Sequence, residues 1–182
     1  FEAFYSKGGH TDVTVKVDGE EIRAHSVILM ARSKVFESML TLPMQESLQR
    51  AVTIKDISTK AVKALLAFMY SGQVDQHLLE SDLDVLDILQ AAHQYDVPSL
   101  VGLCVQALSG HVTIETVSEW LHVADLIGNA AWKSECLEFM RSRMSEVQAT
   151  ASYAKLAAAH PALLADIMSI MVPPATRPPA LP

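Results

Sequence analysis

The sequence has few cysteines and no cysteine pair. Only Cys104 and Cys136 occur among 182 residues, each within an apolar helical pattern and far from any C-x-x-C spacing. This usage argues against a disulfide framework and indicates buried thiols in a reducing compartment. We therefore expect the protein in the nucleus, the cytoplasm or both.

Clusters of basic residues are also missing. The chain has 14 Lys and Arg residues against 21 Asp and Glu residues, which gives a net charge of −7. Because nucleic-acid affinity is built on basic side chains that neutralise phosphates, DNA or RNA is not expected as a partner.

Long apolar runs are absent as well. The most apolar windows, residues 64–70 and 163–172, are short, whereas a membrane-spanning helix needs about 20 apolar residues. No membrane association is expected, and the start lacks the pattern of a signal peptide. The first residue is Phe rather than Met, which suggests an excised fragment, so targeting information could lie in the part that was removed.

Catalytic and metal-binding motifs are not found. The seven histidines form no H-E-x-x-H pattern, no serine lies in a G-x-S-x-G motif, and Gly8-Gly9 is no phosphate loop. His122 and Asp125 are three residues apart, but an exposed pair or a core histidine explains them better than a metal site. His25 and Asp12 are interpreted as residues that shape the fold. We expect no cofactor, no metal and no enzymatic activity.

The residues that are present predict a small sheet wrapped by helices in the first half. Residues 12–17 alternate apolar and polar side chains, and Asp18-Gly19 is a strong hairpin signal before a second strand over residues 20–24. Two short helices follow, the second with Ser33 as its N-cap. Further elements are expected at 51–54 (a strand), 59–70, 81–95 and 98–110 (helices).

In the second half, apolar residues recur at helical spacing throughout. Its apolar spacing predicts four helices, over residues 113–127, 129–144, 150–159 and 161–171. Residues 173–182 contain five prolines and are predicted to be an extended, disordered tail.

A methionine lies in the predicted loop between the second short helix and the strand at 51–54. One interpretation is that Met44 folds back onto Phe36 or Leu40 while Glu46 is solvated. The other is that Met44 is an adaptable apolar anchor for a partner and that Glu46 accepts a charge-assisted hydrogen bond from it. The residues alone leave both open.

Two aromatic residues, Phe1 and Phe4, begin the chain at helical spacing. Their large apolar area needs cover. Either the parent domain or a second subunit could supply it.

The order of these features resembles a known family. TDVTVKVDGEEIRAHSVILMARSKVFESML, followed by PMQES, VTIKDIS, LLAFMYSG and DILQAAHQYDVPSLVGLC, looks like a BTB/POZ domain over residues 1–110. TIETVSEWLHVADLIGNAAWKSECLEFM and HPALLADIM, within residues 111–172, are similar to the three-box and partial BACK extension of the speckle-type POZ (MATH-BTB) family. The resemblance implies an α+β BTB/POZ fold followed by an all-α extension.

The resemblance also implies a function. Members of this kind are adaptors that bind the cullin-3 N-terminal domain and bring substrates to a ubiquitin ligase. Met44-Gln45-Glu46 fits the family's cullin-binding motif of a hydrophobic residue, any residue and glutamate, and Tyr95 and Asp96 match a region that lines the same surface. The protein substrate would be recruited by a region outside this chain.

A homodimer is the second implication of the resemblance. Phe1 and Phe4 match the hydrophobic positions of the family's N-terminal dimer helix, and Ile28 would face them. The alternative function is a BTB dimerisation module that recruits transcriptional corepressors or other partners without cullin.

Overall fold

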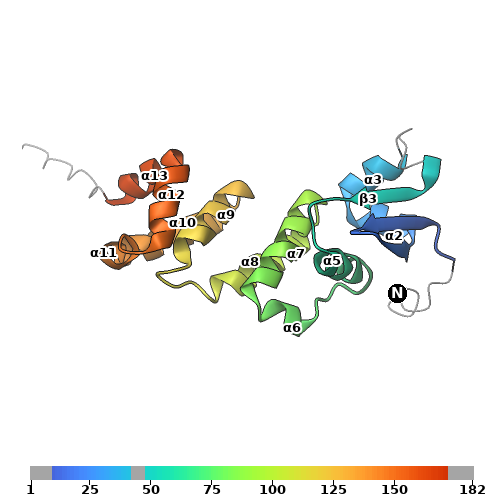
Figure 1. The fold of residues 1–182 in the computed structure, drawn as a ribbon, viewed down its shortest axis with the longest axis horizontal. Helices are drawn as coiled ribbons and strands as arrows, with labels where there is room; N and C mark the ends of the chain where they lie inside the picture. Colours follow the sequence, from blue (N-terminus) through green and yellow to red (C-terminus); the bar gives the residue numbers. More distant parts are fainter. Residues whose placement is uncertain (1–9, 42–47, 172–182) are drawn as a thin grey trace, which may run out of the picture. The chain divides into compact units, whose positions relative to one another are not determined.

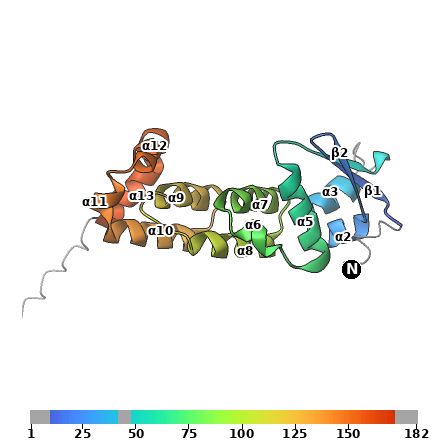
Figure 2. The same ribbon diagram turned by 60° about the horizontal axis from the view of Figure 1, so that its bottom comes forward.

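The computed structural model describes residues 10–41 and 48–171. The chain divides into two compact units, Phe1–Leu108 and Ser109–Pro182 (Figures 1 and 2). The first unit combines a three-stranded sheet with helices, and the described part of the second is helical. The predicted fold class, α+β followed by an all-α extension, is confirmed.

A tight hairpin begins the first unit. Strands β1 (Val13–Val17) and β2 (Glu20–Ala24) pair antiparallel, so that Asp18 and Gly19 form a two-residue turn. Both turn residues have positive φ, 48° and 82°, as the type I′ turn that matches the twist of the strands requires. The hairpin predicted from the sequence is confirmed.

The third strand, β3 (Ala51–Ile54), pairs parallel to β1 and gives the strand order β2-β1-β3. Alternate side chains of a strand point to opposite faces of its sheet. The three valines of β1 are accordingly buried together with Val52 and Ile54, whereas Lys16 is exposed. One face of the sheet therefore forms part of the core.

Two short helices, α2 (Ser26–Arg32) and α3 (Lys34–Thr41), lie between β2 and β3 in the chain. They are separated by Ser33, whose backbone is extended with φ −145°. The Ser33 hydroxyl accepts a hydrogen bond from the Phe36 N–H at 3.1 Å, which is the N-cap interaction that the sequence predicted.

The remaining helices of the first unit are α5 (Thr59–Ser71), α6 (Gln76–Leu79), α7 (Asp82–Gln94) and α8 (Pro98–Ser109). Helix α5 packs against α2 and α7 and buries eight of its thirteen residues. The Ser58 hydroxyl caps its first turn, and Gly72 ends it at a left-handed φ of 75°. Helix α5 is thus the core helix of this unit.

The second unit contains α9 (Val117–Leu126), α10 (Ala130–Ser142), α11 (Met144–Val147), α12 (Ala151–Ala159) and α13 (Pro161–Met171). Helices α9 and α10 pack side by side (Figure 2). Their tryptophans, Trp120 and Trp132, are buried and stacked with ring centroids 6.4 Å apart.

A charged group joins three helices of the second unit. Lys133 Nζ on α10 lies 2.6 Å from Asp125 Oδ1 on α9 and 2.7 Å from Asp166 Oδ2 on α13. Hydrogen bonds from the ammonium group to Asp125 and Asp166 raise the pKa of Lys133. The group stays charged and ties the three helices together at their surface.

Two helix boundaries of the second unit differ from the prediction. The helix expected from residue 113 begins at Val117, because the Thr113 and Thr116 hydroxyls accept hydrogen bonds from each other's N–H groups, at 3.2 and 3.0 Å. Such local bonds replace helical ones. The helix expected to reach Met144 ends at Ser142, and Arg143, with φ −133°, separates it from α11.

Two features are absent from the described residues. Within them, no single helix is both long and apolar enough to cross a membrane; α12 and α13 meet the length and composition requirement only when taken together across a 114° bend. The described ranges hold no group of three or more His, Cys, Asp or Glu side chains that could bind a metal ion.

Candidate protein-docking site

Four of the residues predicted to form interfaces are not described. Met44 and Glu46 belong to residues 42–47, and Phe1 and Phe4 to residues 1–9, both outside the described ranges. The described part of the predicted site consists of α3, which leads into residues 42–47, and the corner between α7 and α8.

Helix α3 is fixed to that corner by two contacts. Phe36 is fully buried and stacks on the Tyr95 ring with centroids 4.6 Å apart and an interplanar angle of 18°. The Ser33 hydroxyl donates a hydrogen bond to the Tyr95 carbonyl oxygen at 2.5 Å. The helix that leads into the Met44 segment is therefore held at its first turn by the chain around Tyr95.

The structure gives Tyr95 a different place from the predicted one. The sequence placed it at the cullin-binding surface, but its side chain is only 2% exposed. Burial raises the pKa of Tyr95 to about 12, so the ring stays neutral. The Tyr95 ring packs against α3 through Phe36. It therefore offers no surface to a partner.

Asp96, by contrast, is exposed at the corner. Its φ of 49° is left-handed, a conformation that Asp tolerates better than most residues. The turn is closed by bonds from the Asp96 N–H to the His93 carbonyl (3.2 Å) and from the Val97 N–H to the Ala92 carbonyl (2.8 Å). This closed turn directs the chain into α8 and leaves the carboxylate in solvent.

A cleft of about 460 Å³ lies between the corner and the junction of α2 and α3. Among the charged residues of this cleft, only Asp96 was predicted to belong to the cullin-binding surface. Its charged lining is balanced, with two cations and two carboxylates: Arg32, Lys34, Glu37 and Asp96. The exposed polar residues on one face of residues 34–41 are a signal for Lys34 and Glu37, whereas Arg32 lies at the end of the preceding helix, outside this pattern.

Ile28 lines a second, smaller cleft, of about 230 Å³, between α2 and α5. Ile28 itself is half-buried, and the neighbouring Val27 is 66% exposed. The other lining residues are Ala31, Arg32, Met69 and Tyr70. Except for one guanidinium and one phenol, this surface is apolar.

Asp12 and His25 hold the start of α2 in place. Asp12 accepts hydrogen bonds from the Ser26 N–H (2.7 Å) and hydroxyl (2.6 Å), and the Arg50 guanidinium lies 3.7 Å away. Partial burial raises the pKa of Asp12, but the Ser26 bonds and Arg50 outweigh it and lower the pKa below its usual value. The His25 N–H donates to the Tyr70 oxygen at 2.8 Å. Both residues therefore shape the fold, as predicted.

His122 stacks on His160, with ring centroids 3.9 Å apart. From the sequence, His122 was considered together with Asp125, three residues along the chain. The Asp125 carboxylate binds Lys133 instead. Partial burial, with a smaller contribution from His160, lowers the pKa of His122, although Asp125 opposes this. The neutral imidazole is therefore the favoured form in the folded protein.

Two family models match the chain. Residues 1–112 match the model described as "BTB/POZ domain", and residues 116–168 match the one described as "BPM/SPOP, BACK domain". The chain belongs to the BTB/POZ family. The predicted combination of a BTB/POZ domain with a BACK-type extension is thereby confirmed. These domains are typical of protein-interaction adaptors that are not enzymes.

The BTB chain also resembles curated proteins of the mouse, Mus musculus. It is 35% identical to "TD and POZ domain-containing protein 4" and 34% identical to "TD and POZ domain-containing protein 1", in each case over 156 residues that make up 86% of this chain. The matched residues account for 42% of each relative. The chain thus spans less than half the length of these relatives.

Proposed function

We propose that the chain is an adaptor that forms a homodimer, binds the cullin-3 N-terminal domain and brings protein substrates to a ubiquitin ligase. The observation that carries the proposal is a sequence motif directly after a helix that the structure describes. Met44-Gln45-Glu46 follows α3, and α3 is fixed through Phe36 and Ser33 to the corner that carries Asp96. Substrates would bind to a region outside this chain.

The described part of the site supports a docking role by its chemistry. Glu37 and Asp96 offer exposed carboxylates along one cleft, and Arg32 and Lys34 offer cations beside them. Charges of both signs in one cleft fix the register of a partner more than they add affinity. An apolar anchor is then needed for affinity, and Met44 is the candidate that the motif supplies.

The dimer part of the proposal rests on the cleft around Ile28. An exposed valine beside a half-buried isoleucine forms an apolar surface that a helix with two aromatic residues can cover. Phe1 and Phe4 of a second copy would be those residues. The cleft proposed for cullin docking and the cleft proposed for dimerisation are neighbours that share Ala31 and Arg32.

Calorimetric titration with the purified cullin-3 N-terminal domain tests the cullin contact. We expect a dissociation constant of about 1 µM or lower, equivalent to about 8 kcal/mol. Met44→Ala and Glu46→Lys should each weaken binding about tenfold or more. Met168→Ala and Glu146→Lys, matched changes at exposed positions of the second unit, should leave the affinity unchanged.

Two outcomes would contradict the proposal. Undiminished binding by both variants would show that Met44 and Glu46 do not contact the cullin-3 domain. If the unaltered chain does not bind, the cullin proposal is wrong. The alternative is then favoured, a BTB module that recruits corepressors or only dimerises.

A further inference from the structure

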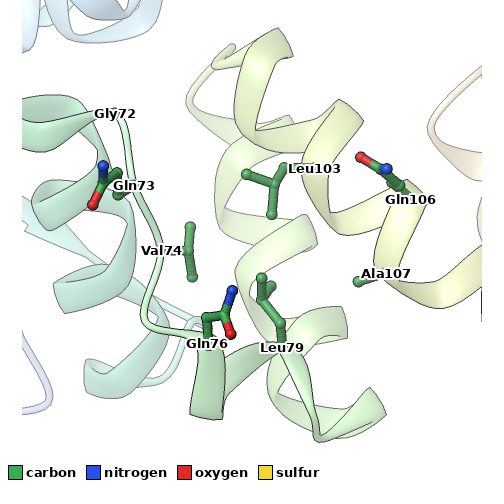
Figure 3. A pocket seen from close by; sticks show the side chains of 8 residues that line it. All are labelled: Gly72, Gln73, Val74, Gln76, Leu79, Leu103, Gln106 and Ala107. Carbon is green, nitrogen blue, oxygen red and sulfur yellow. The ribbon is translucent and has the colours of Figure 1, made fainter.

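Three clefts of the first unit differ in the charged residues that line them. The cleft around Asp96 has two cations and two carboxylates, and the cleft around Ile28 has a single cation, Arg32. A third cleft, of about 560 Å³, lies between the loop after α5, helix α6 and helix α8 (Figure 3). Its lining residues, such as Val74 and Leu103, include no charged one. Of these three, the Ile28 cleft is therefore the one in which a lone charge borders an apolar surface.

Arg32 is the last residue of α2 and lies at the border of two clefts. It is exposed and lines both the Ile28 cleft and the neighbouring Asp96 cleft. Glu37 and Asp96 line the second cleft with it. Within the described part of the chain, however, no hydrogen bond or ion pair joins the Arg32 guanidinium to another residue. The guanidinium is therefore available to a carboxylate of a partner.

The remainder of the Ile28 cleft offers apolar surface to a partner. Val27 is exposed, and the Tyr70 oxygen already accepts a hydrogen bond from the His25 N–H at 2.8 Å. A segment that covers this surface also takes water away from the guanidinium of Arg32. Removing a cation from water is costly unless an anion pairs with it. We therefore expect the segment that covers the cleft to carry a carboxylate.

The segment proposed to cover the cleft contains one carboxylate. Residues 1–9, with the sequence FEAFYSKGG, carry the acidic side chain of Glu2 and no other. Glu2 lies next to Phe1 and two positions before Phe4, and consecutive Cα atoms are only about 3.8 Å apart. A carboxylate is thus present beside the two aromatic side chains for which the cleft is proposed.

We infer that Glu2 of one copy forms an ion pair with Arg32 of the other copy. The inference rests on the proposed dimer and adds the charges that fix the register of its two chains. A two-fold dimer contains this contact twice, and an Arg–carboxylate pair can form two parallel hydrogen bonds, which defines its geometry. Like charges at the same place repel. The pair therefore selects, as a dimer partner, a chain with a carboxylate beside its aromatic residues.

Charge reversal in the full chain tests the pair. Sedimentation equilibrium gives the dissociation constant of the dimer for the unaltered chain, for Glu2→Arg and for Arg32→Glu. Each single change places like charges at both contacts of the dimer, so the dissociation constant should rise about tenfold or more. Glu2→Arg combined with Arg32→Glu restores opposite charges and should return most of the lost affinity.

A mixture of the two single variants shows whether the pair joins two chains. In a dimer of one Glu2→Arg chain and one Arg32→Glu chain, both contacts bring opposite charges together, whereas each variant alone brings like charges together. At the same total concentration, the equimolar mixture should therefore form more dimer than either variant alone. An ion pair within one chain would give no such recovery on mixing.

Two matched reversals outside the contact serve as controls. Lys34→Glu changes a cation that lines the Asp96 cleft but not the Ile28 cleft. Glu146→Arg changes an exposed carboxylate of the second unit. Neither should weaken the dimer. Circular dichroism of each variant verifies that it is folded.

Three results would overturn the inference. If the unaltered chain is a monomer at every concentration, the proposed dimer is wrong and the ion pair with it. If the chain is dimeric but Glu2→Arg and Arg32→Glu leave the dissociation constant unchanged, only the ion pair is wrong. The same holds if both variants weaken the dimer but their mixture forms no more dimer than either alone.

Discussion

Ser33 is nearly fully buried, and its hydroxyl group serves two segments that are distant in the chain. It accepts a hydrogen bond from the Phe36 N–H at the start of α3 and donates one to the Tyr95 carbonyl oxygen at the corner after α7. A single side chain thus starts α3 and fastens it to the corner that displays Asp96.

We expect Ser33→Ala to destabilise the chain by about 2 kcal/mol, because about 1 kcal/mol is lost with an N-cap and a similar amount when a buried carbonyl loses its partner. Urea unfolding followed by circular dichroism measures the change. Ser58→Ala is the matched control, since Ser58 caps α5 through the Ala61 N–H alone. The prediction is wrong if Ser33→Ala costs no more than Ser58→Ala.

The sequence predicts one member of this contact but not the other. Ser33 lies directly before an apolar helical pattern, so local spacing identifies it as an N-cap. The burial of Tyr95 depends on the Phe36 ring, which stacks on it from a distant part of the chain. Spacing within one helix cannot show a contact between two elements. The assignment of Tyr95 to the surface came from the family resemblance, which says nothing of the Phe36 ring that covers it in this chain.

The buried thiols are a further feature at the scale of single residues. Burial raises the pKa of Cys104 and of Cys136 to about 12, with Glu135 contributing at the second. Thiolate, the reactive form, is therefore scarce at neutral pH. Both side chains act as small apolar core residues, which is the use that the sequence predicted for them.

At the scale of elements, the sequence predicts those with strong local signals. The hairpin at Asp18-Gly19 and the cap at Ser33 both occur where they were expected. Helices α6 and α11 were missed, because four residues are too few to show a helical period. For α6 a signal existed, since the Asp75 carboxylate accepts a hydrogen bond from the His77 N–H at 3.0 Å.

The contact between α9 and the end of α12 includes a pair of histidines. His122 on α9 stacks on His160, the residue that ends α12. Partial burial and the proximity of His160 lower the pKa of His122 below its ordinary value of 6.5. The unfolded chain therefore binds a proton at a higher pH than the folded chain does.

It follows that the second unit loses stability as the pH falls from about 7.5 to about 5.5, because unfolding takes up protons in that window. Both tryptophans of the chain lie in α9 and α10, so tryptophan fluorescence during thermal unfolding reports this unit. His122→Gln should reduce the pH dependence of the midpoint. His93→Gln, at an exposed position on α7, should leave it intact, and an equal effect of the two variants would contradict the prediction.

At the scale of the whole molecule, the candidate sites differ in how far the sequence predicts them. The Met-x-Glu motif is contiguous and is found by reading the chain. The Asp96 cleft combines residues from elements that are apart in sequence, Arg32 with Asp96. Without the fold, nothing indicates that these residues are neighbours.

In the proposed dimer, residues 1–9 of one copy, which the structure does not describe, contact the described cleft around Ile28 of the other. If Phe1 and Phe4 of one copy cover the Ile28 cleft of another, the mass in solution will be twice the 19.9 kDa of one chain. Ile28→Asp would place a charge inside that apolar contact, where desolvation is costly even with Arg32 one turn away, and should shift the mass toward one chain at micromolar concentration.

Light scattering coupled to size exclusion measures that mass. Phe4→Asp changes the opposite side of the same contact and should give the same shift. Leu83→Asp, at a leucine that is 77% exposed on α7, adds an equal charge outside the cleft and should leave the dimer intact. If Ile28→Asp and Phe4→Asp both remain dimeric, the apolar cleft between α2 and α5 is not the dimer surface, and the dimer must form through another face of the first unit or through the second unit.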